Sequence, residues 1–242
     1  MSMHLILDIG NTNVKYHLFD QKDCVLSAMV NSIELVAVKV LQDLPVISHV
    51  IFSDVRGIMT KEQLQLIFPK LQVAEVKSLL FPFDSNYTTP ATLGDDRIAL
   101  VAAATKKYPQ QNCLIIDAGT CLTYDFLSQE GAYLGGAISP GLQMRFKSLK
   151  HFTGKLPLVQ PQGFFSLFGD STETSINNGV MAGIVHEIEG QINTYQEKYP
   201  SLTVILTGGD ALHLSKSVKN TIFAEPNFLA EGMNYLLDYN KN

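Results

Sequence analysis

Two stretches of this sequence combine a carboxylate with the small and hydroxylated residues that typically surround phosphate groups. The first, residues 8–15 with the sequence DIGNTNVK, lies between two apolar runs, which predicts a strand, a tight turn and a second strand. A glycine there lets backbone amides approach a ligand, the amide and hydroxyl groups can donate to phosphate oxygens, and the carboxylate can hold a metal ion or its waters. The candidate phosphate-binding residues are Asp8, Gly10, Asn11, Thr12, Asn13 and Lys15.

The second stretch, residues 114–125 with the sequence LIIDAGTCLTYD, repeats this design around Asp117 and Thr120. Asp117 follows Asp8 by 109 residues, nearly half of the 242-residue chain. Two such hairpins that face each other across a cleft can clamp a nucleoside triphosphate with its metal ion. Asn and Gly are also ordinary residues of solvated turns, so either stretch alone leaves that alternative open. The repetition favours the phosphate-binding interpretation.

A third candidate is the run Gly94-Asp95-Asp96-Arg97, which precedes a predicted helix at 98–107. One of the two carboxylates can accept a proton from a substrate hydroxyl, as the base of phosphoryl transfer does. The arginine can pair with an anionic substrate through a bidentate fork. Acidic residues also stabilise the start of a helix through its dipole, so one carboxylate can serve only that purpose.

The run Thr207-Gly208-Gly209 follows an apolar strand predicted at 202–206. Ligands bind at the carboxyl ends of strands in α/β domains, and the flat approach of a purine over Gly208 and Gly209 is consistent with that position. Paired glycines also end strands without any ligand, so this alternative stays open.

Composition excludes several other classes of protein. The net charge is −5, so the chain lacks the excess of positive charge that binding to nucleic acid or an anionic membrane requires. Hydrophobic residues make up 46% of the chain. The six histidines have no metal-binding spacing, and serine-hydrolase, zinc-protease and P-loop motifs are absent from the sequence. Three scattered cysteines without a C-x-x-C pair, no signal peptide and no apolar run of ~20 residues predict a cytoplasmic protein.

The order of the predicted elements indicates two α/β halves. The first half predicts strands at 4–7, 14–19, 24–30, 46–52 and 71–76, and helices at 33–44 and 60–68, followed by a polar loop at 81–94. The second half predicts the hairpin around Asp117, a strand at 133–139, helices at 142–152, 177–195 and 228–239, and a strand at 202–206. The internal duplication predicts two domains, residues 1–108 and 109–242.

Six motifs occur together in one order along the chain. They are DIGNT at 8–12, GxDR at 94–97, DxGT at 117–120, GGxIxPG at 135–141, Thr172 seven residues before Gly179, and TGG at 207–209. Each is weak alone, but all six in this order are specific. With them the chain resembles the type III pantothenate kinases of the acetate and sugar kinase/actin-like superfamily.

The resemblance implies two ribonuclease-H-like domains with an ATP cleft between them. It implies ATP-dependent phosphorylation of pantothenate to 4′-phosphopantothenate, the first step of coenzyme A biosynthesis. Mg²⁺, a monovalent cation (K⁺ or NH₄⁺) and a homodimer are expected from the family as well.

The resemblance also implies individual roles. Asp96, rather than Asp95, is expected to be the catalytic proton acceptor. The hairpin at 8–15 and Thr120 are expected to hold the ATP phosphates, with Asp117 on the monovalent cation and Asp8 as a candidate Mg²⁺ ligand through water. The expected pantothenate contacts are Tyr87, Gly94, Asp95, Arg97 and, across a homodimer interface, Thr172.

Two alternatives remain. One is a non-catalytic nucleotide-binding regulator of the same fold, which would need no base; the intact Asp8, Asp96 and Asp117 argue against it. The other is a kinase for another small alcohol, which would keep the ATP motifs and differ within residues 87–97.

Overall fold

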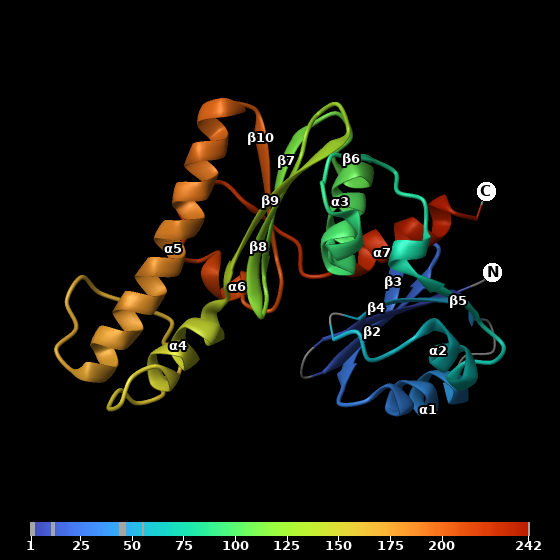
Figure 1. Cartoon of the computed structure of the whole chain (residues 1–242), viewed down its shortest axis with the longest axis horizontal. Coiled ribbons are helices and arrows are strands. Elements are labelled where there is room, and N and C mark those ends of the chain that lie inside the picture. Colours follow the sequence, from blue (N-terminus) through green and yellow to red (C-terminus); the bar gives the residue numbers. More distant parts are fainter. Residues whose placement is uncertain (1–2, 11–12, 44–46, 55, 242) are drawn as a thin grey trace. The chain divides into compact units, whose positions relative to one another are not determined.

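The computed structural model describes residues 3–10, 13–43, 47–54 and 56–241. The chain divides into two compact units (Figure 1). Unit 1 consists of residues 1–109 and 227–242, and unit 2 of residues 110–226. The last helix of the chain therefore belongs to the first unit, whereas the sequence analysis grouped it with the second half. The helix belongs to unit 1 because it packs against residues that are far away in sequence, and no local pattern predicts such packing.

The sheet of unit 1 has the strand order β3-β2-β1-β4-β5. β1, β2 and β3 pair antiparallel, whereas β4 pairs parallel with both β1 and β5. The central strands are apolar because both faces are covered, as the sequence pattern predicts for parallel neighbours. The strands are β1 (Met3–Ile9), β2 (Val14–Asp20), β3 (Asp23–Val30), β4 (Ile47–Asp54) and β5 (Gln72–Glu75); a short β6 (Asp84–Ser85) follows along the chain and is not part of this sheet.

Helices cover both faces of this sheet, with α1 and α2 on one side and α3 and α7 on the other (Figure 1). Val36, Val40, Leu64 and Phe68 of the α1–α2 side are almost completely buried against the strands. The helices are α1 (Ile33–Asp43), α2 (Lys61–Ile67), α3 (Asp95–Lys107) and α7 (Phe228–Tyr239), and short 3₁₀ turns lie at η1 (Val76–Ser78) and η2 (Pro90–Thr92).

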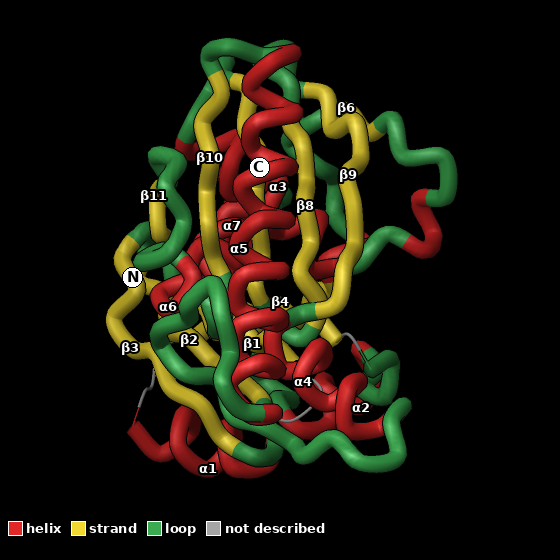
Figure 2. Tube along the Cα trace, turned by 90° about the vertical axis from the view of Figure 1, so that its left-hand side faces the viewer, coloured by secondary structure: helices red, strands yellow, loops and turns green. Residues whose placement is uncertain are grey.

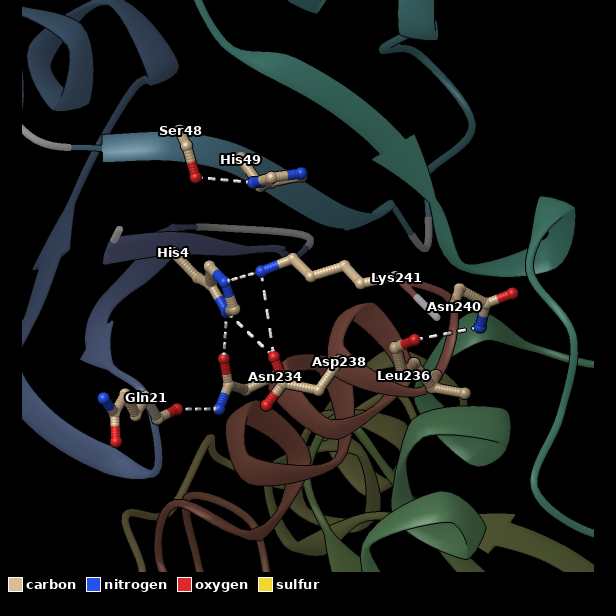
Figure 3. A network of polar contacts seen from close by, with 9 residues as sticks. All are labelled: His4, Gln21, Ser48, His49, Asn234, Leu236, Asp238, Asn240 and Lys241. Atoms are coloured by element: carbon tan, nitrogen blue, oxygen red, sulfur yellow. Dashed lines mark hydrogen bonds and ion pairs between the residues drawn. The ribbon is translucent and has the colours of Figure 1, made fainter. Parts of the chain in front are cut away.

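A buried polar network ties α7 to the N-terminal strands (Figure 3). The His4 ring donates through Nδ1 to Oδ1 of Asn234 at 2.6 Å, and Nδ2 of Asn234 donates to the backbone carbonyl of Gln21 at 2.7 Å. The Lys241 ammonium contacts the other ring nitrogen of His4 and lies 3.8 Å from Asp238. His4 and Asn234 are only 2% and 1% exposed, so the bond between these two side chains is shielded from water. The network fixes where α7, and hence its neighbour α3, lies.

Unit 2 repeats the topology of unit 1. Its strands follow the order β11-β10-β7-β8-β9, with β7, β8 and β9 antiparallel and β10 parallel to β7 and β11. β7–β8 thus corresponds to β1–β2, and β10 to β4, which confirms the duplication seen in the sequence. The strands are β7 (Asn112–Ala118), β8 (Cys121–Leu127), β9 (Ala132–Pro140), β10 (Leu202–Thr207) and β11 (Phe223–Ala224).

The long helix α5 (Thr172–Lys198) runs across one face of this sheet (Figure 2). Its apolar stripe, including Ile176, Ile184 and Ile188, packs on strand residues of the unit 2 core. The helix begins five residues before the predicted start, because Ser171 and Thr174 form a capping box. The other helices of the unit are α4 (Leu142–His151) and α6 (Ala211–Leu214). Among the described residues, no helix has the length and apolar character that a membrane span requires.

Candidate functional site

The first hairpin places Asp8 and Lys15 opposite each other. They are register partners next to the turn that joins β1 and β2, so their side chains share one face of the sheet. The backbone amide of Gly10 donates to the carbonyl of Asn13 at 3.0 Å and closes the turn. Asn11 and Thr12, both expected to bind phosphate, lie outside the described residues.

Within unit 1, the end of β1 lies close to the start of α3. Burial raises the pKa of the Asp8 carboxyl, the positive charge of Lys15 lowers it, and the negative charge of Asp96 raises it again. The effect of Asp96 on Asp8 means that two carboxylates predicted from motifs 88 residues apart gather in one region. A site with two such groups favours a cation or a cation-bound phosphate.

The carboxylate of Asp96 folds back over Gly94. A Cβ at Gly94 would lie 2.3 Å from Oδ1 of Asp96, so only glycine leaves room for this arrangement. The same oxygen accepts the backbone N–H of Arg97 at 2.8 Å. Asp96 remains partly exposed, as a proton acceptor for an incoming hydroxyl requires.

Arg97 and Tyr87, both predicted from the sequence, contact each other. The Arg97 guanidinium lies 5.5 Å from the centre of the Tyr87 ring, and its Nη1 donates to the tyrosine hydroxyl at 3.4 Å. Arg97 is only 5% exposed. The ring therefore orients the guanidinium through a cation–π contact and a hydrogen bond.

Asp95 differs from Asp96 in its surroundings. It is buried, with the Lys77 ammonium 3.8 Å from its Oδ1. Burial raises the pKa of Asp95 to about 6; Lys77 opposes the rise, and Glu75, Asp96 and Asp54 add to it. Lys77 is a residue that the sequence analysis missed, because it precedes its partner by 18 positions in an irregular segment.

In unit 2, the Asp117 turn and the Thr207–Gly209 turn lie side by side. Asp117 pairs in register with Thr207, and the backbone N–H of Asp210 donates to the carbonyl of Ala118 at 3.0 Å. Gly208 has a φ of +94°, and a Cβ there would lie 2.3 Å from Oδ1 of Asp117. The structure thus brings together two motifs that the sequence analysis singled out separately.

Thr120 is exposed at the tip of the β7–β8 turn, and its backbone carbonyl accepts the N–H of Gly141 at 3.2 Å. The motif at 135–141, which resembles the family pattern, therefore supports the second hairpin directly.

Thr172 begins α5 and lines a pocket of ≈ 690 Å³ in unit 2. The lining comes from α4, α5 and the segment between them. It is mainly apolar with a few hydroxyl groups and one guanidinium, from Arg145, Ser148, Leu149, Leu156, Thr172, Ser175, Ile176, Gly179 and Val180. Apolar walls with few polar groups suit a small organic ligand.

Among the described residues, no group of three or more His, Cys, Asp or Glu side chains forms a metal centre. The oxygen donors in unit 1 are the carboxylates of Asp8 and Asp96, and Asp117 is the donor in the unit 2 turns. Mg²⁺ commonly binds to one or two carboxylates together with substrate phosphates, a pattern that these donor sets fit.

Comparisons with known proteins identify the family and the fold of the chain. A family model described as type III pantothenate kinase matches residues 4–194. A type III pantothenate kinase from Christiangramia forsetii is 46% identical over 248 residues, covering 99% of each chain.

Two solved structures share the fold alone and confirm the predicted α/β class. One, from Campylobacter jejuni and described as a Baf family transcriptional activator, has 22% identity, 98% coverage of each chain and a TM-score of 0.66. The other, the activator of 2-hydroxyisocaproyl-CoA dehydratase from Clostridium difficile with bound ADPNP, has 14% identity, coverage of 99% and 95%, and a TM-score of 0.53.

Proposed function

We propose residue roles for a chain that belongs to the type III pantothenate kinase family, and that therefore phosphorylates pantothenate with ATP in coenzyme A biosynthesis. The product is 4′-phosphopantothenate. The observation that carries the proposal is that Asp8 and Asp96, which belong to two different motifs, lie close enough in unit 1 for the charge of Asp96 to raise the pKa of Asp8.

Asp96 is the general base in this proposal. It is partly exposed at the start of α3 and its carboxylate is held by the N–H of Arg97. Asp95 is buried against Lys77 and is less accessible to a hydroxyl group. Asp96 orients the terminal hydroxyl of pantothenate and accepts its proton as the oxygen attacks the γ-phosphorus.

The ATP phosphates bind at the two hairpin turns. In unit 1 the carboxylate, backbone and positive charge come from Asp8, Gly10, Asn11, Thr12, Asn13 and Lys15. In unit 2 the ATP phosphates bind at Thr120, and Gly208 and Gly209 let the nucleotide approach the backbone. Lys15 offsets the negative charge that builds up on the transferring group.

A divalent cation accompanies ATP in kinases, and we assign it as Mg²⁺ near Asp8, held through water. When bound, it neutralises charge on the phosphates. The raised pKa of Asp8 fits this role, because a nearby cation stabilises the ionised carboxylate that burial and Asp96 disfavour. We assign a monovalent cation, K⁺ or NH₄⁺, to Asp117, whose Oδ1 borders the space that a side chain at position 208 would fill.

Pantothenate carries a carboxylate, and Arg97 is the cation that we expect to bind it, oriented by Tyr87. Gly94 and Asp95 complete this side of the substrate site. Thr172 contributes from the pocket in unit 2, across a homodimer interface. The cytoplasmic location stays a prediction.

Exposed apolar side chains support the homodimer. Phe152, Phe164, Leu167 and Phe168, all between α4 and the start of α5, are 77–86% exposed. Apolar patches of this kind mark interaction surfaces. Phe168→Ser should weaken the dimer in sedimentation, whereas Leu66→Ser, at an equally exposed position on α2, should not. A monomeric wild-type chain at micromolar concentration would contradict the assignment.

The decisive experiment measures ADP release with ATP, Mg²⁺ and K⁺, for pantothenate and a panel of small alcohols and sugars. Turnover with pantothenate is expected, and Asp96→Asn should lower kcat by about 10²–10⁴-fold while pantothenate binding is retained.

Four other outcomes would contradict parts of the proposal. ATP binding without turnover would favour the non-catalytic regulator, and turnover with another alcohol alone would favour a kinase for that alcohol. Near-normal turnover of Asp96→Asn would remove Asp96 from its role. Equal activity with Na⁺ alone would contradict the cation assignment at Asp117.

A further inference from the structure

Arg145 in α4 connects several elements of unit 2 through its guanidinium group. Its Nε donates to the backbone carbonyl of Pro140 at 2.8 Å, and its Nη2 donates to Oγ of Ser139 at 3.1 Å. Nη2 also donates to Oε2 of Glu187 in α5. The two charged side chains are 19% and 25% exposed, so the ion pair is largely shielded from water.

Glu187 is itself anchored on the sheet. Its second carboxylate oxygen, Oε1, accepts the hydroxyl of Tyr124 in β8 at 3.1 Å. Tyr124 is 1% exposed, and its burial, together with the charge of Glu187, raises its pKa, so the hydroxyl stays protonated and donates. Arg145 and Glu187 therefore form a fixed bridge between α4, α5, β8 and the end of β9.

The end of β9 in turn supports the second hairpin. Ser139 and Pro140 pair in register with Leu122 and Cys121, directly after Thr120. The next residue, Gly141, donates its N–H to the Thr120 carbonyl, and a Cβ there would lie 2.5 Å from that oxygen. Thr120 thus rests on a backbone segment, residues 139–141, that Arg145 holds from the other side.

We propose that Arg145, through Glu187 and residues 139–141, is a positioning residue that fixes the Thr120 turn for ATP binding. This rests on the proposed role of Thr120 at the ATP phosphates. Arginine suits the task because its planar fork contacts the Pro140 carbonyl and the Ser139 hydroxyl at once, whereas a lysine ammonium is a point charge on a flexible chain. No local sequence pattern marks Arg145, whose partners are brought to it only by the fold.

Arg145 also lines the pocket of Thr172, which defines the competing role, direct contact with the substrate in that pocket. The two roles make different kinetic predictions. Loss of a positioning contact at the Thr120 turn raises KM for ATP, whereas loss of a pocket contact raises KM for pantothenate. A merely structural role lowers the folded fraction, and with it the apparent kcat, while both KM values stay unchanged.

The test compares Arg145→Met with Lys147→Met, an exposed position on the same helix that loses the same charge. Arg145→Met should raise KM for ATP about tenfold with KM for pantothenate within about twofold, and Lys147→Met should change neither. Arg145→Lys should restore less than half of the loss. If Arg145→Met fails to fold, the isosteric Glu187→Gln, which retains hydrogen bonding, should still raise KM for ATP severalfold.

Thr120→Ala separates this inference from the proposed function. Thr120→Ala should raise KM for ATP, and the double variant with Arg145→Met should raise it no further than the larger single effect, because both act at one contact. An effect of Thr120→Ala without one of Arg145→Met overturns the positioning role alone, as does a rise in KM for pantothenate only. An effect of Arg145→Met without one of Thr120→Ala overturns both the role of Thr120 and the inference built on it.

Discussion

A Cβ atom at Gly208 would lie 2.3 Å from Oδ1 of Asp117 and 2.6 Å from the carbonyl oxygen of Ala118. Gly208 also has a φ of +94°, where side chains are strained. Gly209 next to it has open space at the same position. The two glycines of one motif therefore serve different purposes: the first permits a close approach to the Asp117 carboxylate, and the second leaves open space beside the turn.

Gly208→Ala should lower both stability and activity. The backbone of Ala118 cannot yield to the new methyl group, so we expect a loss of about 1–3 kcal/mol in the free energy of unfolding. Gly209→Ala should leave the melting temperature unchanged and weaken only ATP binding. Thermal unfolding and ATP titration of both variants check this; equal melting temperatures for the two variants would contradict the packing argument.

Gly94→Ala should separate catalysis from stability. The atom that the new Cβ would meet is the end of the flexible Asp96 side chain, which can move at little cost in folding energy. Moving a catalytic base by about 1 Å lowers kcat by about 10–100-fold, so activity should fall while the melting temperature barely changes. Gly190→Ala on α5, with no atom within 4 Å of its Cβ, is the control and should retain full activity. A normal kcat for Gly94→Ala would show that Asp96 tolerates the displacement.

Asp95 should make stability depend on pH. Burial raises its pKa from 3.8 to about 6, so the folded chain binds this proton more tightly than the unfolded chain does. Its contribution is fully present below pH 3.8 and is lost as the pH rises through about 6. Asp95→Asn should therefore stabilise the chain at pH 7.5, by on the order of 1–3 kcal/mol, with the gain vanishing near pH 4.

Lys77→Met should act in the opposite direction. Without the ammonium at 3.8 Å, the ionised Asp95 is less favourable, so the variant should be less stable than wild type at pH 7.5 and equal to it near pH 4. Chemical denaturation across this pH range measures both variants. Parallel curves for wild type and Asp95→Asn would mean that Asp95 titrates alike in the folded and unfolded chain.

Asn234→Ala should detach α7 from the N-terminal strands. The change removes the buried hydrogen bond to His4, whose Nδ1 is left unsatisfied, and the partly buried bond to the Gln21 carbonyl (Figure 3). We expect a loss of about 2–4 kcal/mol in the free energy of unfolding. Asn193→Ala, which loses one exposed bond to Asn220, should change stability by less than about 0.5 kcal/mol.

Most of the secondary structure could be predicted because it is locally encoded. Alternating or continuous apolar runs mark all the longer strands, and the two hairpins with Asp8 and Asp117 were found from their repeated pattern. The contacts of Arg97 with Tyr87, and of the Asp117 turn with Gly208, join residues that the sequence analysis had chosen for chemical reasons. Motifs that occur in a fixed order carry this information even when each is weak alone.

What could not be predicted depends on distant partners. Lys77 and Arg145 have ordinary sequence surroundings, and their importance comes from Asp95, Glu187 and Pro140, which fold next to them. The first turn of α5 was missed because Ser171 and Thr174 cap the helix with hydroxyl groups and not with the usual acidic residue. The place of α7 in unit 1 likewise depends on partners that are distant in sequence, Asn234 and His4.

The position of α7 has a consequence for biosynthesis on the ribosome. Unit 2 emerges as one continuous segment, whereas unit 1 is interrupted and needs residues 227–242 to be complete. His4 leaves the exit tunnel long before Asn234, because 230 positions separate the two residues. The proposed base on α3 therefore lacks the support of α7 until unit 2 has been synthesised. Until then the nascent first unit stays open to chaperones and proteases, so its maturation has to wait for α7.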